Sequence, residues 1–156
     1  MNPLVNAPRE EANEYFIERV PQSKALGLRI TDFGGGRAVF ELPYDTKLVG
    51  DPDSGVISGG AITTLVDAAC GCAILTGLRT LRRIVTLDLR IDYLRPGKPG
   101  QTVVCTAECY RYTHEVAFVR AWAHDGNPED LLATAAGTFV LLEELFQKPG
   151  SGGASS

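Results

Sequence analysis

The sequence predicts an α+β domain in which one antiparallel sheet wraps around one long central helix. Residues 56–78 carry the only long helical pattern in the 156-residue sequence, with two strand patterns before it and four after it. The later strand patterns are joined by short connections, which link antiparallel neighbours. Because a helix must bury its apolar face against another layer, a single sheet is the expected partner.

The chain divides into three parts by composition. Residues 1–24 are expected to form an N-terminal extension with a short amphipathic helix between Pro8 and Pro21. Residues 25–145 are expected to form the main domain. Residues 146–156 are rich in Gly and Ser and are predicted to be a disordered tail.

A hairpin is predicted ahead of the central helix. Its strands are residues 26–33 and 37–42, and its turn is the triple glycine at 34–36. Residues 43–55 are predicted to be a loop that leads directly into the helix. Loops at such places often carry function.

The central helix is predicted to begin at a Ser58 cap and to stop at Gly77. At about 100° per residue, one face forms a core stripe of Ile62, Leu65, Val66, Ala69 and Ala73. The opposite face carries Gly60, Thr63, Asp67, Cys70, Gly71 and Ile74. This second face has small residues and one carboxylate, so another backbone or a ligand could approach it. Asp67 is therefore a functional candidate, and the alternative is a partly hydrated carboxylate at a subunit interface.

The strand after the helix has the most regular alternation in the sequence. Its apolar residues are predicted to face the core, and they are Val85, Leu87, Leu89, Ile91 and Tyr93. The residues between them are predicted to face solvent, and they are Thr86, Asp88, Arg90 and Asp92. A turn is predicted at 95–100, followed by strands at 102–112, 115–124 and 131–142.

Charge and composition argue against two classes of partner. The net charge is −4 at pH 7 and the sequence pI is about 5.2, without a basic stripe, so a nucleic-acid partner is not expected. The polar residues of the central helix and the lack of an aromatic belt argue against a membrane span. The N-terminus has no pattern of a secretory signal.

The cysteines indicate a reducing compartment. They are Cys70, Cys72, Cys105 and Cys109. None forms a C-x-x-C pair, so they are expected to be small buried residues of a cytoplasmic protein. No metal site is predicted, because neither histidine has ligand spacing with them.

A local positive spot follows the helix. It is formed by Arg79, Arg82 and Arg83. These cations either complement the helix C-terminus or bind a phosphorylated ligand, and both readings remain open.

Three stretches resemble the hotdog-fold acyl-CoA thioesterases, and their phenylacetate-degradation (PaaI-like) branch in particular. The helix start, V-I-S-G-G at 56–60, and the L-V-D at 65–67 resemble the family's His-Gly-Gly and Leu-x-Asp signature. Residues 86–96, T-L-D-L-R-I-D-Y-L-R-P, resemble the next strand and its exit. The closing strand at 133–142 resembles the last one, so the resemblance extends over about residues 26–142.

The resemblance implies a hotdog fold and hydrolysis of an acyl-CoA to a free acid and coenzyme A, without a cofactor beyond the substrate's own coenzyme A. It implies a homodimer or homotetramer with the active site at the dimer interface. Asp67 would be the catalytic carboxylate, acting as a general base or as a nucleophile. The Gly59 N–H would donate to the thioester oxygen, a role that suits the free N–H groups of a helix start. Thr86 would help to hold the attacking water, or would be an ordinary surface threonine.

Substrate binding is predicted to involve the rest of the helix start, Ser58 and Gly60. Ser58 replaces the family histidine, so it can cap the helix but cannot act as an imidazole acid. Arg95 could meet the phosphates of coenzyme A or be an ordinary turn residue.

Arg111 and His114 are weaker candidates for the same contact with phosphate. A second departure from the family lies upstream, where Asp51 or Asp53 stands near the position of a family asparagine. A carboxylate there would repel an oxyanion.

Two other functions compete with a thioesterase. A non-catalytic acyl-CoA-binding or regulatory hotdog module is the alternative that Ser58 favours. A hydratase on the same fold is disfavoured because no histidine pairs with the helix acid. Ser58 itself is not expected to be a serine-hydrolase nucleophile, since its surroundings do not match G-x-S-x-G.

Overall fold

The structure is a computed structural model in which residues 1–145 are described. The predicted tail at 146–156 lies outside the described residues. The elements are α1 (Arg9–Asn13), the π-helical turn η1 (Glu14–Glu18), α2 (Pro21–Leu26), β1 (Arg29–Gly34), β2 (Arg37–Leu42), the 3-10 turn η2 (Thr46–Leu48), β3 (Val49–Asp51), β4 (Val56–Ile57), α3 (Gly59–Gly77), β5 (Arg82–Tyr93), β6 (Val103–Tyr112), β7 (Val116–His124) and β8 (Ala133–Glu144).

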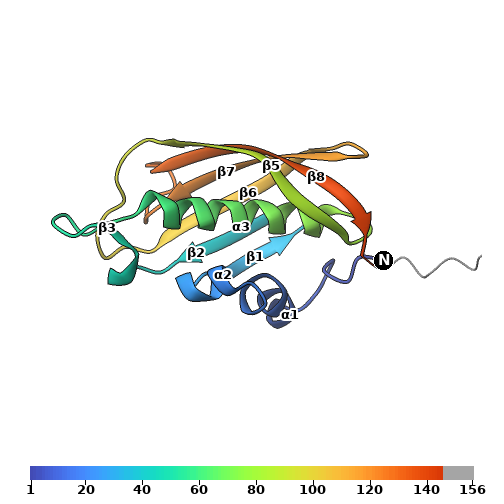
Figure 1. Cartoon of the computed structure of the whole chain (residues 1–156), viewed down its shortest axis with the longest axis horizontal. Helices are drawn as coiled ribbons and strands as arrows, with labels where there is room; N and C mark the ends of the chain where they lie inside the picture. The colour runs from blue at the N-terminus through green and yellow to red at the C-terminus, as the bar shows by residue number, and fades with distance from the viewer. Residues whose placement is uncertain (146–156) are drawn as a thin grey trace, which may run out of the picture.

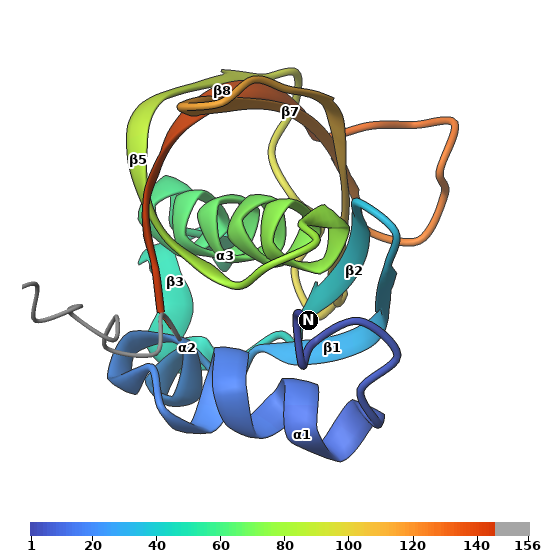
Figure 2. The ribbon, with the colours of Figure 1, turned by 90° about the vertical axis from the view of Figure 1, so that its right-hand side faces the viewer.

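One six-stranded antiparallel sheet surrounds α3, as predicted. Its strand order is β1-β2-β6-β7-β8-β5, and β3 pairs only with β4. Figure 1 shows α3 running along the inside of the sheet, and Figure 2, viewed toward the end of α3, shows how far the sheet curls around it. The helices α1 and α2 lie beside β1, on the side of α3 that β7 and β8 do not cover.

Local signals define both ends of α3. The Ser58 Oγ accepts a hydrogen bond from the Ala61 N–H at 3.3 Å, so the predicted cap is confirmed. The helix ends at Gly77, also as predicted. Its last carbonyls, those of Leu75 and Leu78, accept hydrogen bonds from the buried Asn2 side chain at 2.7 and 2.9 Å. The N-terminal peptide therefore closes the helix C-terminus, which the sequence pattern did not indicate.

The sheet buries more of α3 than the helical pattern predicted. Cys70 and Ile74 were assigned to the face opposite the core stripe, yet both are 0% exposed. The sheet curls past the edge of the stripe, so a helix position about 100° away from it still contacts a strand. By length and composition α3 could cross a membrane, but most of it is buried inside this protein. What remains accessible is a band that includes Gly59, Thr63 and Asp67.

A β-bulge corrects the predicted faces of β5. Thr86 pairs with Phe139, and the next pair joins Asp88 to Thr138, so Leu87 has no direct partner on β8. Because directly paired residues share a face, Thr86 lies on the side of the buried Phe139. Val85 and Leu87, predicted to face the core, are 47% and 64% exposed.

The register beyond the bulge agrees with the predicted alternation. Leu89 and Ile91 pair with Gly137 and Ala135, and both are half-buried against the core. The extra residue in β5 therefore reverses the faces only before the bulge. The strand is at one end of the sheet order, where bulges are common.

The N-terminal half differs in detail from the predicted elements. The single helix predicted between Pro8 and Pro21 is α1 followed by η1, and α2 was not predicted. The first strand begins at Arg29, because Gly27 has a φ of 74° and ends α2. The predicted loop at 43–55 contains η2 and β3, and β3 pairs with β4, which follows the loop directly.

The turn after β5 is held by a buried ion pair. The Arg95 guanidinium donates two hydrogen bonds to the buried Asp125 carboxylate, at 2.6 and 3.1 Å, and another to Asp130. This turn does not join neighbouring strands, since β5 pairs with β8 and β6 pairs with β2. The Lys98 N–H also donates a hydrogen bond to the Asp125 carboxylate, at 2.7 Å. Together with the Arg95 contacts, this bond attaches the segment between β5 and β6 to the β7–β8 connection.

This ion pair is expected to make the stability of the protein decrease in acid. The Arg95 hydrogen bonds lower the pKa of Asp125 from 3.8 to about 2. A depressed carboxyl pKa stabilises the fold above the unfolded-state value, so this contribution, about 2 kcal/mol, should disappear as the pH falls from about 5 to 2. We expect Asp125→Asn to lose it at neutral pH, and urea unfolding at pH 7 and pH 3 measures the difference. Asp130→Asn, which removes an exposed partner, is the matched control and should change stability much less.

Candidate active site

Asp67 and Thr86 meet across the helix–strand boundary. The Thr86 hydroxyl donates a hydrogen bond to the Asp67 Oδ1 at 2.8 Å. The bulge in β5 makes this contact, because without it Thr86 would face away from α3. One carboxylate oxygen is thereby oriented and the other, Oδ2, has no hydrogen-bond partner among residues 1–145. An accessible carboxylate held in one orientation can accept a proton or attack an electrophile.

Asp67 opens into a cavity of about 300 Å³ that is mostly apolar. Part of its wall comes from α3 and the sheet, where Cys72, Leu75 and Phe139 line it. Another part comes from the N-terminal extension, including Tyr15 and Phe16. This volume is at the lower end of ligand-pocket sizes. A carboxylate at the mouth of an apolar pocket suits a substrate with a polar reacting group and an apolar tail.

The first two residues of α3, Gly59 and Gly60, have backbone N–H groups that are free to donate hydrogen bonds. Neither backbone N–H has an acceptor among the described residues, and both glycines are exposed. The helix dipole adds partial positive charge at this end. A carbonyl oxygen that gains negative charge could therefore be stabilised here.

Tyr93 holds the Gly59 peptide in place and was not predicted to do so. Its hydroxyl donates to the Gly59 carbonyl at 2.8 Å and lies 2.9 Å from the Thr63 hydroxyl. The sequence pattern placed Tyr93 on the inner face of β5, but it did not indicate that the strand end reaches the start of α3.

Gly59 and Asp67 line different cavities of the same chain. Gly59 borders a hollow of about 440 Å³ together with Ile62, Tyr93 and Leu94. Asp67 borders the 300 Å³ cavity, and the two share no lining residue. Eight residues of helix separate the two groups, which is about 12 Å along the axis. One chain therefore does not bring its own N–H donor and carboxylate to one substrate carbon.

The other predicted binding residues lie away from both Asp67 and its cavity. Arg95 borders the hollow at Gly59, with its guanidinium in the ion pairs described above. Arg111 is exposed at the end of β6, and His114 is exposed in the β6–β7 turn. Neither lines the cavity of Asp67 or the hollow of Gly59. Their contact with a phosphate group stays a prediction.

Two arginines of the positive spot after α3, Arg82 and Arg83, make contacts within the protein, and binding of a phosphorylated ligand by this spot stays a prediction. Arg82 donates to the carbonyls of Leu141, Leu142 and His114, which ties β5 to β8 and to the β6–β7 turn. Arg83 pairs with an exposed glutamate of β8. Asn2 and the Tyr112 hydroxyl, rather than these cations, donate hydrogen bonds to the carbonyls of Leu75, Leu78 and Ile74 at the C-terminal end of α3.

Of the two upstream aspartates, Asp51 makes local hydrogen bonds through its carboxylate. Asp51 accepts hydrogen bonds from the Ser54 hydroxyl and the Asp53 N–H, and both bonds lower its pKa. Neither aspartate lines the hollow at Gly59. The repulsion expected from a carboxylate at this position therefore does not arise within one chain.

The cysteines are free thiols, and Cys109 alone is more than slightly exposed. Burial raises the pKa of the Cys105 thiol to about 12 and raises those of the others too, so none is a reactive thiolate. The reducing, cytoplasmic location stays a prediction. Within residues 1–145, no group of three or more His, Cys, Asp or Glu side chains could hold a metal ion.

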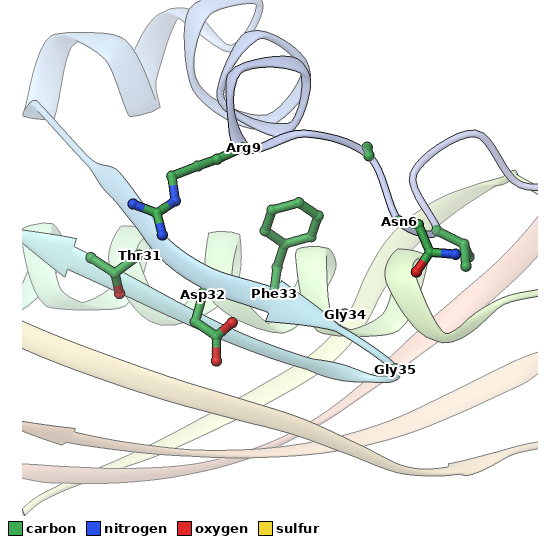
Figure 3. Close-up of a pocket in the computed structure, with 9 residues that line it drawn as sticks. Asn6, Arg9, Thr31, Asp32, Phe33, Gly34 and Gly35 are labelled. Carbon is green, nitrogen blue, oxygen red and sulfur yellow. The ribbon is translucent and has the colours of Figure 1, made fainter.

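A further hollow lies between the N-terminal segment and β1 (Figure 3). Its volume is about 270 Å³, and Arg9, Asp32 and Phe33 line it. Asp32 is already paired with Arg37 at 2.7 Å. None of the predicted site residues borders this hollow, so it is not part of the candidate site.

Comparisons with known proteins identify the family of this chain. The model of the thioesterase superfamily matches residues 54–131, which include Gly59, Asp67 and Thr86. The medium/long-chain acyl-CoA thioesterase YigI of Salmonella typhimurium is 30% identical over 142 residues, covering 83% of this chain and 89% of YigI.

Solved structures share the fold. A Pseudomonas aeruginosa protein of 38% identity superimposes with a TM-score of 0.76 over 85% of this chain and 98% of its own. The Escherichia coli PaaI protein, from the phenylacetic acid degradation operon, has a TM-score of 0.76 at 21% identity over 86% of this chain and 93% of its own. The sheet wrapped around α3 is thus a hotdog fold. The chain belongs to the thioesterase superfamily and is a thioester hydrolase.

Proposed function

We propose that this hydrolase cleaves acyl-CoA thioesters, with Asp67 as the catalytic carboxylate and the Gly59 N–H as the donor to the thioester oxygen. The observation that carries this proposal is the Asp67 carboxylate, oriented by Thr86 at the mouth of an apolar cavity. The acyl chain enters that cavity, and the coenzyme A thiol remains outside. The relative YigI, named as a medium/long-chain acyl-CoA thioesterase, supports this class of substrate.

In the general-base form of the reaction, the free Asp67 oxygen takes a proton from a water molecule. The water oxygen attacks the thioester carbon, and the carbonyl oxygen becomes an oxyanion that accepts the Gly59 N–H hydrogen bond. The C–S bond then breaks, and the departing thiolate takes the proton from Asp67. In the nucleophilic form, Asp67 attacks the thioester carbon directly, and the C–S bond breaks to release the coenzyme A thiolate and leave a mixed anhydride. Water then hydrolyses the anhydride to the free acid and the Asp67 carboxyl group, whose proton passes to the thiolate.

Each site is shared by two subunits of a homodimer. The separation of Gly59 from Asp67 within one chain supports this arrangement. Two α3 helices packed side by side in opposite directions would place Gly59 of one subunit against Asp67 of the other. The accessible band of α3 is suited to close packing because it contains glycine, threonine and alanine.

The edge of the sheet offers the rest of the contact surface. Strand β5 is the last in the sheet order, and Val85 and Leu87 beside the bulge are exposed hydrophobic residues. An uncovered edge strand with apolar side chains is suited to pairing with another strand. A second copy of β5 would extend the sheet across a twofold axis. A homotetramer built from two such dimers would retain the same β5–β5 contact.

A panel of acyl-CoA substrates with a free-thiol readout tests the proposal. Turnover that releases one coenzyme A per substrate supports the hydrolase, and the preferred acyl group defines its class. The rival is a non-catalytic acyl-CoA-binding module, which the Ser58 departure favours. Tight binding without turnover across the whole panel would establish that rival.

Ser58→His is expected to retain or raise the rate of thiol release, since the helix start otherwise resembles a family with histidine there. The exchange also removes the cap on the Ala61 N–H, so we expect a loss of about 1 kcal/mol in stability. Steady-state kinetics beside thermal unfolding separate the two effects. Ser58→Ala, which loses the cap without adding an imidazole, is the matched control. A folded but inactive histidine variant would show that the site is built around serine.

A further inference from the structure

Part of the wall of the Asp67 cavity is formed by the N-terminal extension, outside the region that the superfamily model matches. The π-helical turn η1 supplies Tyr15 and Phe16 to its wall. The wide turn is defined by the hydrogen bond from the Arg19 N–H to the Glu14 carbonyl, five residues earlier. Short π-helical turns in helices occur frequently at functional sites.

Tyr15 separates this cavity from a second one. It lines the 300 Å³ cavity of Asp67 on one side and a cavity of about 430 Å³ on the other. It is the only residue that borders both within the described part of the chain. The second cavity has an apolar part formed by Pro3, Leu4 and Leu81, and charged residues of α1 and η1 at its rim.

The barrier between the two cavities is made by packing. The Tyr15 ring contacts Phe16 edge-on, with the ring centroids 5.0 Å apart, and is half-buried against the core. Its hydroxyl has no hydrogen-bond partner among residues 1–145. Burial raises its pKa, so the side chain is neutral at physiological pH. An uncharged aromatic side chain can end an acyl pocket without repelling the chain.

We propose that Tyr15 determines the longest acyl chain that the enzyme accepts, by closing the Asp67 cavity against the second cavity beside Leu81. The inference rests on the proposed acyl-CoA hydrolysis at Asp67. Chains that reach the ring are accepted, and longer ones must displace it. Removal of the ring joins the two cavities and opens an apolar path toward Leu4 and Leu81.

The test measures kcat/KM for saturated acyl-CoAs of increasing length with the wild type and with Tyr15→Ala. We expect the optimum of the variant to move to longer chains. The ratio of kcat/KM for a chain beyond the wild-type optimum to that for the optimal chain should rise about tenfold or more, because each methylene in an apolar pocket is worth about tenfold or more. Tyr15→Phe keeps the ring and should retain the wild-type profile. Tyr110 is an exposed tyrosine on β6 that borders neither cavity. Tyr110→Ala is therefore the control for the loss of a tyrosine ring away from the cavities.

Tyr15→Leu accompanies the alanine variant in case the larger cavity destabilises the fold. An unchanged chain-length profile in a folded alanine or leucine variant would overturn the inference. Calorimetric titration with the same acyl-CoAs gives an independent result, since the length dependence of Kd should shift in the same direction. If the wild type binds the panel but releases no thiol, the proposed function fails, and the shift in Kd still decides the role of Tyr15.

Discussion

Asparagine in place of Asp67 is expected to lower kcat by about 10²–10⁴-fold, the usual contribution of a positioned general base. The amide has nearly the same shape and can still accept the Thr86 hydroxyl that now bonds the carboxylate. It cannot take a proton from water and it is a poor nucleophile. The loss should therefore appear in kcat, with little change in thermal stability or in the binding of acyl-CoA.

Asp88→Asn is the matched control for this experiment. Asp88 is an exposed aspartate next to the bulge on the same strand as Thr86. The same loss of charge at this position should leave turnover close to that of the wild type. Release of thiol by the Asp67 variant at near wild-type rates would contradict both the general-base and the nucleophilic role.

Two inactive variants are expected to restore activity to each other when their subunits are mixed. Asp67→Asn removes the carboxylate, and Gly59→Pro removes the N–H donor. Proline suits the first position of a helix, and the extended backbone of Ser58, with ψ of 144°, suits the residue before a proline. The substitution should therefore delete the donor while keeping α3.

In a mixed dimer, one shared site carries both lesions and the other carries neither. Random pairing makes half of the dimers mixed, so refolding equal amounts together should recover about a quarter of the wild-type activity in a twofold-symmetric dimer. Each variant refolded alone is the control. If native mass spectrometry detects mixed dimers and no activity returns, Gly59 and Asp67 act within one subunit and the shared site is wrong.

Much of the fold could be predicted from local patterns. The helical period located α3, and its start followed from Ser58, because an N-cap depends on a few neighbouring residues. The predicted last residue, Gly77, was also correct, but Gly77 has no positive φ and the C-cap is the extended Leu78. The triple glycine defined the first hairpin, since all three residues have positive φ, from 59° to 134°. The lone carboxylate on a helix face of small residues indicated Asp67, which the structure places in a cavity with Thr86.

The remaining features depend on contacts between residues far apart in the chain. The alternation in β5 predicted that Thr86 faces solvent, but pairing with β8 inserts a bulge that turns Thr86 toward Asp67. The burial of Cys70 and Ile74 follows from how far the sheet curls, which helical periodicity does not describe.

The walls of the Asp67 cavity were likewise decided by the tertiary structure. Tyr15 reaches the cavity because the N-terminal helices pack beside α3, which begins more than 40 residues after Tyr15 in the chain (Figure 2). The sequence by itself determined which elements form and which carboxylate is isolated, because both follow from patterns of residues close together in the chain. Only long-range packing decided which side chains surround that carboxylate, because register, sheet curvature and helix docking are set by contacts between distant segments.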